Sequence, residues 1–361
     1  MKFGILTSGG DCPGLNAAIR GVVKSAFNRG SAVAVGISDG YRGLIDNRTR
    51  ILRPDDVTGI LTMGGTILGA SREKPFEGRD DASMTDAEAG LGKPELIVET
   101  YRKLKLDCLV VLGGNGTQTT ASRLQQEGLK VIGLPKTIDN DLYGTDVSFG
   151  FHSALSIATE GVDRLHSTAS SHNRVMVIEL MGHKAGWLAL NAGIAGGGDV
   201  ILIPEIPYSA DRVAAHIESR GKSGKAFSIV VVAEGAISRE EALMDKKERR
   251  RLRAAQPWPS IGYRIASEIA ERTKMETRVT VLGYLQRGGI PSAYDRVLAT
   301  CFGSAAADLM YEGQFGRMIC RRNGVIGSIS LADVAGKTRK VPEDHELLKT
   351  ARCVGTCLGE V

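Results

Sequence analysis

Short apolar runs alternate with amphipathic segments along most of the chain. The apolar runs predict strands at residues 3–7, 33–37, 109–112, 131–134, 175–180, 200–203, 228–233 and 279–282. Segments with helical periodicity predict helices at residues 15–29 and 151–169, and from about Thr117 and Ser292 onwards. This alternation predicts an α/β fold, with layers of helices around mainly parallel sheets.

The length of 361 residues allows two domains, each with its own core. We expect one domain at residues 1–150 plus about 262–303, and another at 151–261 plus about 304–361. Residues 77–93 are polar and glycine-rich, which predicts a surface loop or flap. The basic run at residues 246–253 has helical character and is typical of a solvated helix face, with anion binding as the alternative.

Composition restricts the possible partners. Hydrophobic residues make up 42% of the chain and charged residues 24%, which is ordinary for a soluble globular protein. The net charge of +5 and the 5% aromatic content favour small anionic substrates over nucleic acid. The six cysteines lack metal-site spacing and predict reduced thiols in a cytoplasmic protein. No secretory signal or bilayer-length apolar run is present, so no membrane association is expected.

Two glycine-rich loops follow predicted strands. Gly9-Gly10-Asp11 comes after the first strand, and Gly113-Gly114-Asn115-Gly116-Thr117 comes after a later one. Glycine lets the backbone approach an oxyanion, and the amides that begin the next helix add partial positive charge. Each loop alone is as consistent with a tight turn. The presence of two favours a phosphate site at neighbouring strand ends.

The run Pro135-Lys136-Thr137-Ile138-Asp139-Asn140-Asp141 also follows an apolar strand. Phosphoryl transfer needs positioning, cations and an acceptor for the proton of the attacking hydroxyl. Asp139 is a candidate base, Asp141 a candidate Mg²⁺ ligand, and Thr137 a candidate hydrogen-bonding partner of the substrate. An acidic Asx turn is the alternative for this run taken alone.

Arginines stand near several predicted strand ends. Arg72 follows a loop of small residues, Arg174 and Arg278 open strands, and Arg287 lies in Gln286-Arg287-Gly288-Gly289. Guanidinium groups bind phosphate in bidentate fashion, although a lone arginine is usually a surface residue. Glu234 ends an apolar strand and is a candidate for sugar hydroxyls or for a buried ion pair. Together these residues predict transfer of a phosphoryl group to a phosphorylated sugar.

The combined motifs resemble the phosphofructokinase family, whose members phosphorylate fructose 6-phosphate at the 1-hydroxyl. The matching segments are Gly-Gly-Asp-Cys-Pro-Gly-Leu-Asn-Ala, Pro-Lys-Thr-Ile-Asp-Asn-Asp, Met-Gly-His and Gln-Arg-Gly-Gly, in family order. The resemblance runs from Met1 to about Gly303. It implies two Rossmann-like three-layer α/β/α domains with the active site in the cleft between them. The first domain is expected to bind the donor, the second fructose 6-phosphate.

The resemblance also implies roles for individual residues. It makes Asp139 the proton acceptor and puts Lys136, Thr137 and Asp141 beside it at the catalytic centre. The implied donor site consists of Gly10, Arg72, Gly114, Asn115, Gly116 and Thr117, with Asn115 and Asp141 at the Mg²⁺. The implied fructose 6-phosphate site consists of Thr137, Ile138, Asp139, Arg174, Met181, Gly182, His183, Glu234, Arg278, Tyr284 and Arg287. Arg174 and Arg278 match residues that reach in from a neighbouring subunit, so a homotetramer or homodimer with shared active sites is expected.

Three positions depart from the family pattern. Many ATP-dependent bacterial members have aspartate in place of Asn115, so metal binding is expected to depend more on Asp141. Many have arginine in place of His183 and histidine in place of Tyr284. The allosteric arginines are only partly matched, which makes regulation by the usual bacterial effectors doubtful.

Two residues bear on the phosphoryl donor. Pyrophosphate-using relatives resemble this chain at Lys136, but they carry aspartate where this chain has Gly116. That carboxylate would occupy the space of the ATP α-phosphate and repel it. Gly116 with Lys136 resembles the mixed-substrate ATP/pyrophosphate branch of the family, whose members with this pair tend to use ATP. We therefore expect ATP, with pyrophosphate as the alternative. A relative of the NAD kinases is disfavoured by the Gln-Arg-Gly-Gly loop, and a non-catalytic sensor by the intact Asp139 and Asp141.

Overall fold

The computed structural model describes residues 1–77 and 92–360, which form two compact units. The first unit consists of Met1–Ile138, Leu142–Ser153 and Arg287–Arg339. The second consists of Asp139–Asp141, Ala154–Gln286 and Lys340–Val361. The chain therefore passes briefly into the second unit at the predicted catalytic run.

The first unit is built on an eight-stranded sheet in the order β12-β11-β5-β4-β1-β2-β3, with β6 paired to β5. Its strands are β1 (Lys2–Thr7), β2 (Val33–Ile37), β3 (Thr49–Leu52), β4 (Cys108–Gly113), β5 (Val131–Thr137), β6 (Phe149–Gly150), β11 (Arg317–Arg322) and β12 (Val325–Ser330). Pairing is parallel except between β2 and β3 and between β11 and β12. Because β1, β4 and β5 are parallel neighbours, the loops after them lie at one edge of the sheet.

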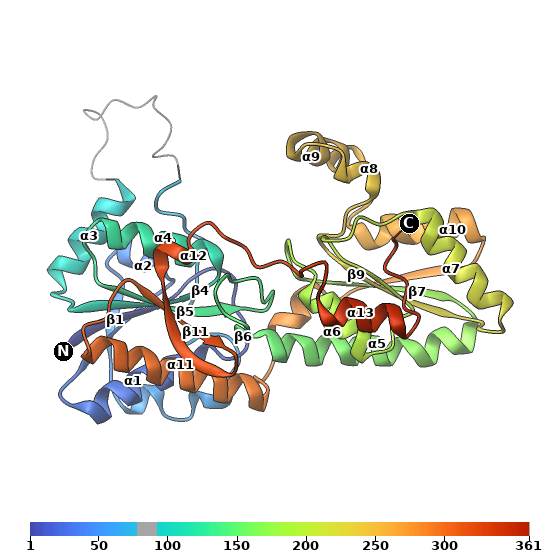
Figure 1. The fold of residues 1–361 in the computed structure, drawn as a ribbon. Helices are drawn as coiled ribbons and strands as arrows, with labels where there is room; N and C mark the ends of the chain where they lie inside the picture. The colour runs from blue at the N-terminus through green and yellow to red at the C-terminus, as the bar shows by residue number, and fades with distance from the viewer. Residues whose placement is uncertain (78–91, 361) are drawn as a thin grey trace. The chain divides into compact units, whose positions relative to one another are not determined.

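Helices cover both faces of this sheet. They are α1 (Leu15–Arg29), α2 (Tyr41–Ile45), α3 (Lys93–Lys103), α4 (Asn115–Gln126), α11 (Ala293–Tyr311) and α12 (Leu331–Val334), with short 3-10 turns at Asp55–Val57 and Ile60–Thr62. Figure 1 shows α1 and α11 on one face and α3, α4 and α12 on the other. The α1 and α11 backbones approach closely, since a Cβ on Gly303 would lie 2.6 Å from the Val22 nitrogen.

The second unit has a four-stranded, fully parallel sheet in the order β10-β7-β9-β8. Its strands are β7 (Val175–Leu180), β8 (Val200–Leu202), β9 (Ser228–Ala233) and β10 (Thr277–Val281). The other elements are α5 (Phe151–His172), α6 (Trp187–Ala195), α7 (Ala210–Lys222), α8 (Arg239–Ala242), α9 (Lys246–Ala255), α10 (Ile261–Thr273), the 3-10 turn η3 (Gly283–Arg287) and α13 (Glu346–Cys353). Figure 1 shows α7 and α10 on one face of this sheet and α5, α6 and α13 on the other. Residues of β7, β8, β9, α7 and α10 form its core.

The predicted α/β fold with mainly parallel sheets is confirmed, and most element positions agree within a few residues. The division into units differs from the predicted boundaries. Residues 262–286 belong to the second unit because β10 pairs with β7. Residues 304–339 belong largely to the first because β11 pairs with β5. Both pairings join segments distant in sequence, which local patterns do not reveal.

The sequence predicted two surface segments, a loop at residues 77–93 and a basic helical run at residues 246–253. Of the expected loop at residues 77–93, residues 78–91 lie outside the described part of the chain. The basic run forms α9, which buries none of its residues. Arg253 of α9 forms an ion pair of 2.7 Å with Glu241, which is fully buried.

Among the described residues, no helix combines the length and apolar character needed to cross a bilayer.

A buried carboxylate in the first unit predicts a pH-dependent contribution to stability. Asp295 is fully buried, and its Oδ2 accepts hydrogen bonds from the Ser153 nitrogen (2.7 Å) and Oγ (2.6 Å). Burial raises the pKa of Asp295 above its ordinary value. The native state therefore holds this proton more tightly than the unfolded state, and the stabilising contribution of Asp295 decreases as pH rises through the window above the ordinary carboxyl pKa.

Asparagine cannot ionise, so we expect Asp295→Asn to lack this pH-dependent contribution to stability. The thermal midpoint of the wild type relative to the variant should therefore decrease as pH is raised from about 4 towards 7. Melting curves of both proteins across this range would test the expectation. A difference in midpoint that does not change with pH would contradict it.

Candidate active site

The loop after β1 is held against two other segments of the first unit. The Ser8 N–H donates to the Leu112 carbonyl at the end of β4 (3.0 Å), and the Gly9 N–H donates to the Ser71 carbonyl (2.9 Å). Gly9 has a φ of 83°, a left-handed conformation that glycine adopts without strain. Arg72, which follows Ser71, is exposed. The predicted donor residues Gly10 and Arg72 therefore belong to neighbouring loops.

The second glycine-rich loop leads directly into α4. Gly114 is the N-cap residue and provides no side-chain cap, and Asn115, Gly116 and Thr117 form the first turn. The first amides of a helix have no intrahelical acceptor and attract anions. A Cβ added to Gly116 would meet no atom within 4 Å. This helix start therefore places the first backbone amides of α4 beside open space at Gly116.

Lys136 and Arg287 lie against the first loop. The Lys136 side chain is 3% exposed, and its Nζ donates to the Gly10 carbonyl. A Cβ on Gly9 would lie 3.6 Å from both Lys136 Nζ and Thr117 Oγ1, so these two polar atoms converge on Gly9. A Cβ on Gly10 would lie 2.7 Å from Arg287 Cζ. Arg287 Nη1 also donates to the Asp11 carbonyl (3.3 Å).

The structure thus brings Arg287, which the sequence assigned to the sugar-phosphate site, into direct contact with the Gly10 loop. Two cationic side chains and two glycine-rich loops meet at one edge of a parallel sheet. Such an arrangement is suited to binding the phosphates of a donor.

The predicted catalytic run begins where β5 ends. Thr137 is the last residue of β5, and its carbonyl accepts a hydrogen bond of 2.8 Å from Ser148 Oγ. Ile138 and Asp141 are buried, whereas Asp139 is partly exposed. Asn140 has a φ of 53°, a left-handed turn conformation that asparagine tolerates. The turn therefore separates the buried Asp141 carboxylate from the more accessible Asp139.

In the second unit, Glu234 follows β9 and binds the loop after β7. Its Oε1 accepts hydrogen bonds from the backbone N–H groups of Gly182 (3.2 Å) and His183 (2.7 Å). The Met181 N–H donates to Gln286 Oε1 (3.3 Å). The predicted residues Met181, Gly182, His183 and Glu234 therefore form one connected group. His183 has a φ of 53°, in the left-handed region that residues other than glycine rarely adopt.

The remaining predicted residues of the second unit lie near β10. Arg174 and Arg278 both form ion pairs with Glu276. Tyr284, in η3, is 72% exposed.

Two supporting residues were not predicted from the sequence. Gln286 belongs to the Gln-Arg-Gly-Gly motif, but its buried side chain supports the loop at Met181. Gln118 is fully buried, and its Nε2 donates to the carbonyls of Gly113 and Leu134, each at 2.9 Å. It therefore links the ends of β4 and β5. Its only sequence signal is a polar residue on the side of α4 expected to be buried.

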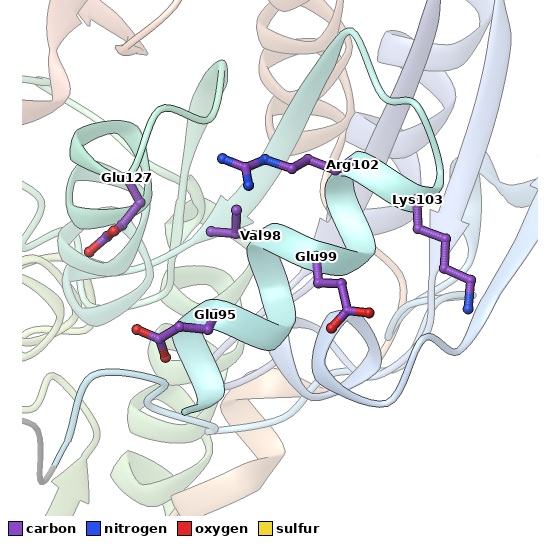
Figure 2. A pocket seen from close by; sticks show the side chains of 6 residues that line it. All are labelled: Glu95, Val98, Glu99, Arg102, Lys103 and Glu127. Atoms are coloured by element: carbon purple, nitrogen blue, oxygen red, sulfur yellow. The ribbon is translucent and has the colours of Figure 1, made fainter. Parts of the chain in front are cut away.

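A surface pocket of about 660 Å³ lies elsewhere in the first unit. It is lined by Glu95, Val98, Glu99, Arg102 and Lys103 of α3 and by Glu127 at the end of α4 (Figure 2). Its charges are of both signs, and none of the predicted site residues lines it. It therefore does not coincide with the candidate active site.

Two glycine-rich loops, a buried lysine and an arginine at one edge of an open α/β sheet are features that a phosphotransferase requires. A family model described as phosphofructokinase matches residues 2–310. The chain belongs to the phosphofructokinase family, and it is an enzyme that transfers phosphoryl groups.

Named relatives agree with this assignment. An ATP-dependent 6-phosphofructokinase of Spirochaeta thermophila is 65% identical over 99% of this chain and 97% of its own length. The phosphofructokinase structure from Saccharomyces cerevisiae has a TM-score of 0.79 and 31% identity, covering 92% of this chain and 45% of that one. A pyrophosphate-dependent phosphofructokinase from Marinobacter aquaeolei has a TM-score of 0.77 and 25% identity, covering 99% of this chain and 88% of that one.

Proposed function

We propose that this enzyme transfers the γ-phosphoryl group of ATP to the 1-hydroxyl of fructose 6-phosphate, giving fructose 1,6-bisphosphate in glycolysis. The observation that carries the proposal is the convergence of Lys136 Nζ and Thr117 Oγ1 on Gly9, beside Arg287 on Gly10. Phosphoryl transfer depends mainly on positioning and on stabilisation of negative charge, and cationic and helix-start groups provide both.

ATP is the donor that the site favours. A Cβ at Gly116 would meet no atom within 4 Å, and this space would accommodate the α-phosphate that pyrophosphate lacks. Lys136 adds one positive charge near the leaving group, which would help either donor. The Spirochaeta thermophila relative, named ATP-dependent, supports the same choice. The alternative is pyrophosphate, the donor named for the 25% identical relative from Marinobacter aquaeolei.

Asp139 would act as the general base. It accepts the proton of the 1-hydroxyl while the sugar oxygen bonds to the γ-phosphorus, and the bond to the bridging oxygen of ADP breaks. Thr137 would hold the substrate beside this base, and Lys136 would stabilise the departing phosphate. The partial exposure of Asp139 fits a group that must meet a substrate.

The sugar phosphate would be bound by residues of the second unit. Glu234 and the backbone at Met181, Gly182 and His183 would contact the sugar hydroxyls. Arg174 and Arg278, together with Tyr284, would bind the phosphate group, since paired guanidinium groups complement a dianion.

Mg²⁺ would be held by Asn115 and Asp141. Their amide and carboxylate oxygens are hard ligands of the kind that Mg²⁺ accepts, and this ion usually takes its other ligands from water and substrate phosphates. Among the described residues, no cluster of three or more His, Cys, Asp or Glu side chains is able to hold a metal. When bound, the ion supplies positive charge that offsets the charge of the transferred phosphoryl group.

We also propose a cytoplasmic homodimer or homotetramer with shared active sites. Val281, Tyr284 and Leu285, at the end of β10 and in η3, are 42%, 72% and 68% exposed. Adjacent exposed apolar residues favour an interface between subunits. This segment follows Arg278, which is expected to serve a neighbouring active site.

Initial rates of fructose 6-phosphate phosphorylation with ATP and Mg²⁺ test the proposal. We expect ADP and fructose 1,6-bisphosphate in equal amounts. ATP hydrolysis without a sugar product, or no reaction, would contradict it.

A further inference from the structure

Two arginines of the second unit share one carboxylate. Arg174 immediately precedes β7, and Arg278 is the second residue of β10, the edge strand of that sheet. Arg174 Nε lies 2.8 Å from Glu276 Oε2, and Arg278 forms an ion pair with Oε1 of the same carboxylate. Each oxygen of Glu276 therefore binds a different guanidinium group.

The register of the two strands explains this arrangement. Thr277 lies opposite Val175, and Arg278 lies opposite Met176. The Val175 N–H donates to the Glu276 carbonyl (3.0 Å), so the Glu276 backbone is held at the start of the sheet. Residues two apart on a strand share a face, and residues opposite each other on paired strands are near neighbours. Glu276 is thus placed to reach both arginines from a fixed backbone position.

We propose that Glu276 is a positioning residue that holds Arg174 and Arg278 ready for the phosphate group of the sugar substrate. This inference rests on the proposed function, which assigns these arginines to the sugar phosphate. Glu276 itself touches neither substrate nor reacting atoms in this role.

Preorganisation is the physical basis of the proposal. The side chains of Arg174, Glu276 and Arg278 are 26%, 44% and 54% exposed, so without a partner both arginines would sample many rotamers. Immobilising such side chains on binding costs affinity, and an ion pair that orders them beforehand reduces that cost. An exposed ion pair adds little to stability, so the main effect of Glu276 is expected on substrate binding.

The Glu276 carboxylate also repels a phosphate, and the two effects must be compared. Two guanidinium charges outnumber one carboxylate charge, so the group as a whole still attracts an anion. Arg174 approaches the carboxylate through Nε, at 2.8 Å from Glu276 Oε2. At half-exposed positions the repulsion is weakened by water and salt. The ordering effect is therefore expected to exceed the repulsion.

The test compares Glu276→Gln and Glu276→Asp with the wild-type full chain. Glutamine keeps the shape without the charge, and aspartate keeps the charge but is too short to reach both arginines. The KM for fructose 6-phosphate, measured with saturating ATP and Mg²⁺, should rise about tenfold in each variant, with kcat unchanged. Thermal midpoints and oligomeric state should match the wild type. As a control, Asp211→Asn removes an exposed ion pair with Arg272 (2.6 Å) in the same unit and should leave this KM unchanged.

Arg174→Ala and Arg278→Ala test the role of the arginines separately from the role of Glu276. If they raise the KM while both Glu276 variants leave it unchanged or lower it, Glu276 is not a positioning residue and the sugar-phosphate site stands. If the arginine variants also leave the KM unchanged, the role proposed for these arginines is wrong, and the inference is overturned with it.

Discussion

Asp139→Ala is expected to lower kcat by about a thousandfold or more, because it removes the acceptor for the proton of the attacking hydroxyl. Asp139 stands directly after the buried Ile138, at the point where the chain leaves β5 and the first unit. Asp139 is partly exposed as a residue, so we expect its replacement to leave the fold intact. Steady-state kinetics with ATP and fructose 6-phosphate would measure the effect, and binding of both substrates should persist because the phosphate-binding groups remain.

A control tests whether the loss of any surface carboxylate lowers kcat. Asp163 is exposed on α5, outside the predicted run, and Asp163→Ala should keep wild-type kinetics. Turnover in the wild type, together with binding but no turnover in Asp139→Ala, would distinguish an enzyme using this base from a sensor that merely binds both ligands. Wild-type kcat in Asp139→Ala would mean that another group accepts the proton and that the mechanism is wrong.

Gly116→Asp is expected to lower kcat/KM for ATP by about a hundredfold or more, since a carboxylate beside a phosphate costs several kcal/mol when both are desolvated. The chain can accept the side chain, because a Cβ at this position meets no atom within 4 Å. Aspartate is also favourable in the first turn of α4, where the helix dipole stabilises negative charge. Loss of ATP use would therefore not result from unfolding.

Gly116→Asn provides the matched variant, with nearly the same volume and no charge. If repulsion is the main effect, only Gly116→Asp should lose ATP activity; if bulk is the main effect, both should. In either case the ratio of pyrophosphate to ATP activity should rise in Gly116→Asp, as measured by kcat/KM for each donor. An unchanged kcat/KM for ATP in both variants would show that Gly116 does not face the donor.

Much of the candidate donor-binding site could be predicted from the sequence, because the patterns that indicate it lie within short segments of the chain. A strand followed by glycines and a helix start predicts a phosphate loop, and β1 with α1 and β4 with α4 have this form. The adjacency of these loops follows from parallel pairing of β1, β4 and β5. The apolar pattern predicted the start of β5 but not its last three residues, Pro135 to Thr137. Pro135 is tolerated because β11 pairs only with Ile132 and Gly133, and β6 begins opposite Lys136.

Interactions between distant segments could not be predicted in this way. The contact between Arg287 and Gly10 joins residues far apart in the chain, and no periodicity indicates it. The same holds for Glu276, whose two partners depend on the register between β7 and β10. Gln118 links β4 to β5 through backbone carbonyls that every residue has, so its role depends only on where α4 packs.

Initial rates with fructose 6-phosphate and Mg²⁺, comparing ATP and pyrophosphate as sole donors, test the central claim most directly. We expect turnover with ATP and none with pyrophosphate, because the α-phosphate would occupy the space at Gly116 and its contacts would contribute to donor binding. Turnover with pyrophosphate alone would contradict the account. Lys136 and its surroundings would then decide the donor in spite of the glycine, and the enzyme would also work in the reverse direction.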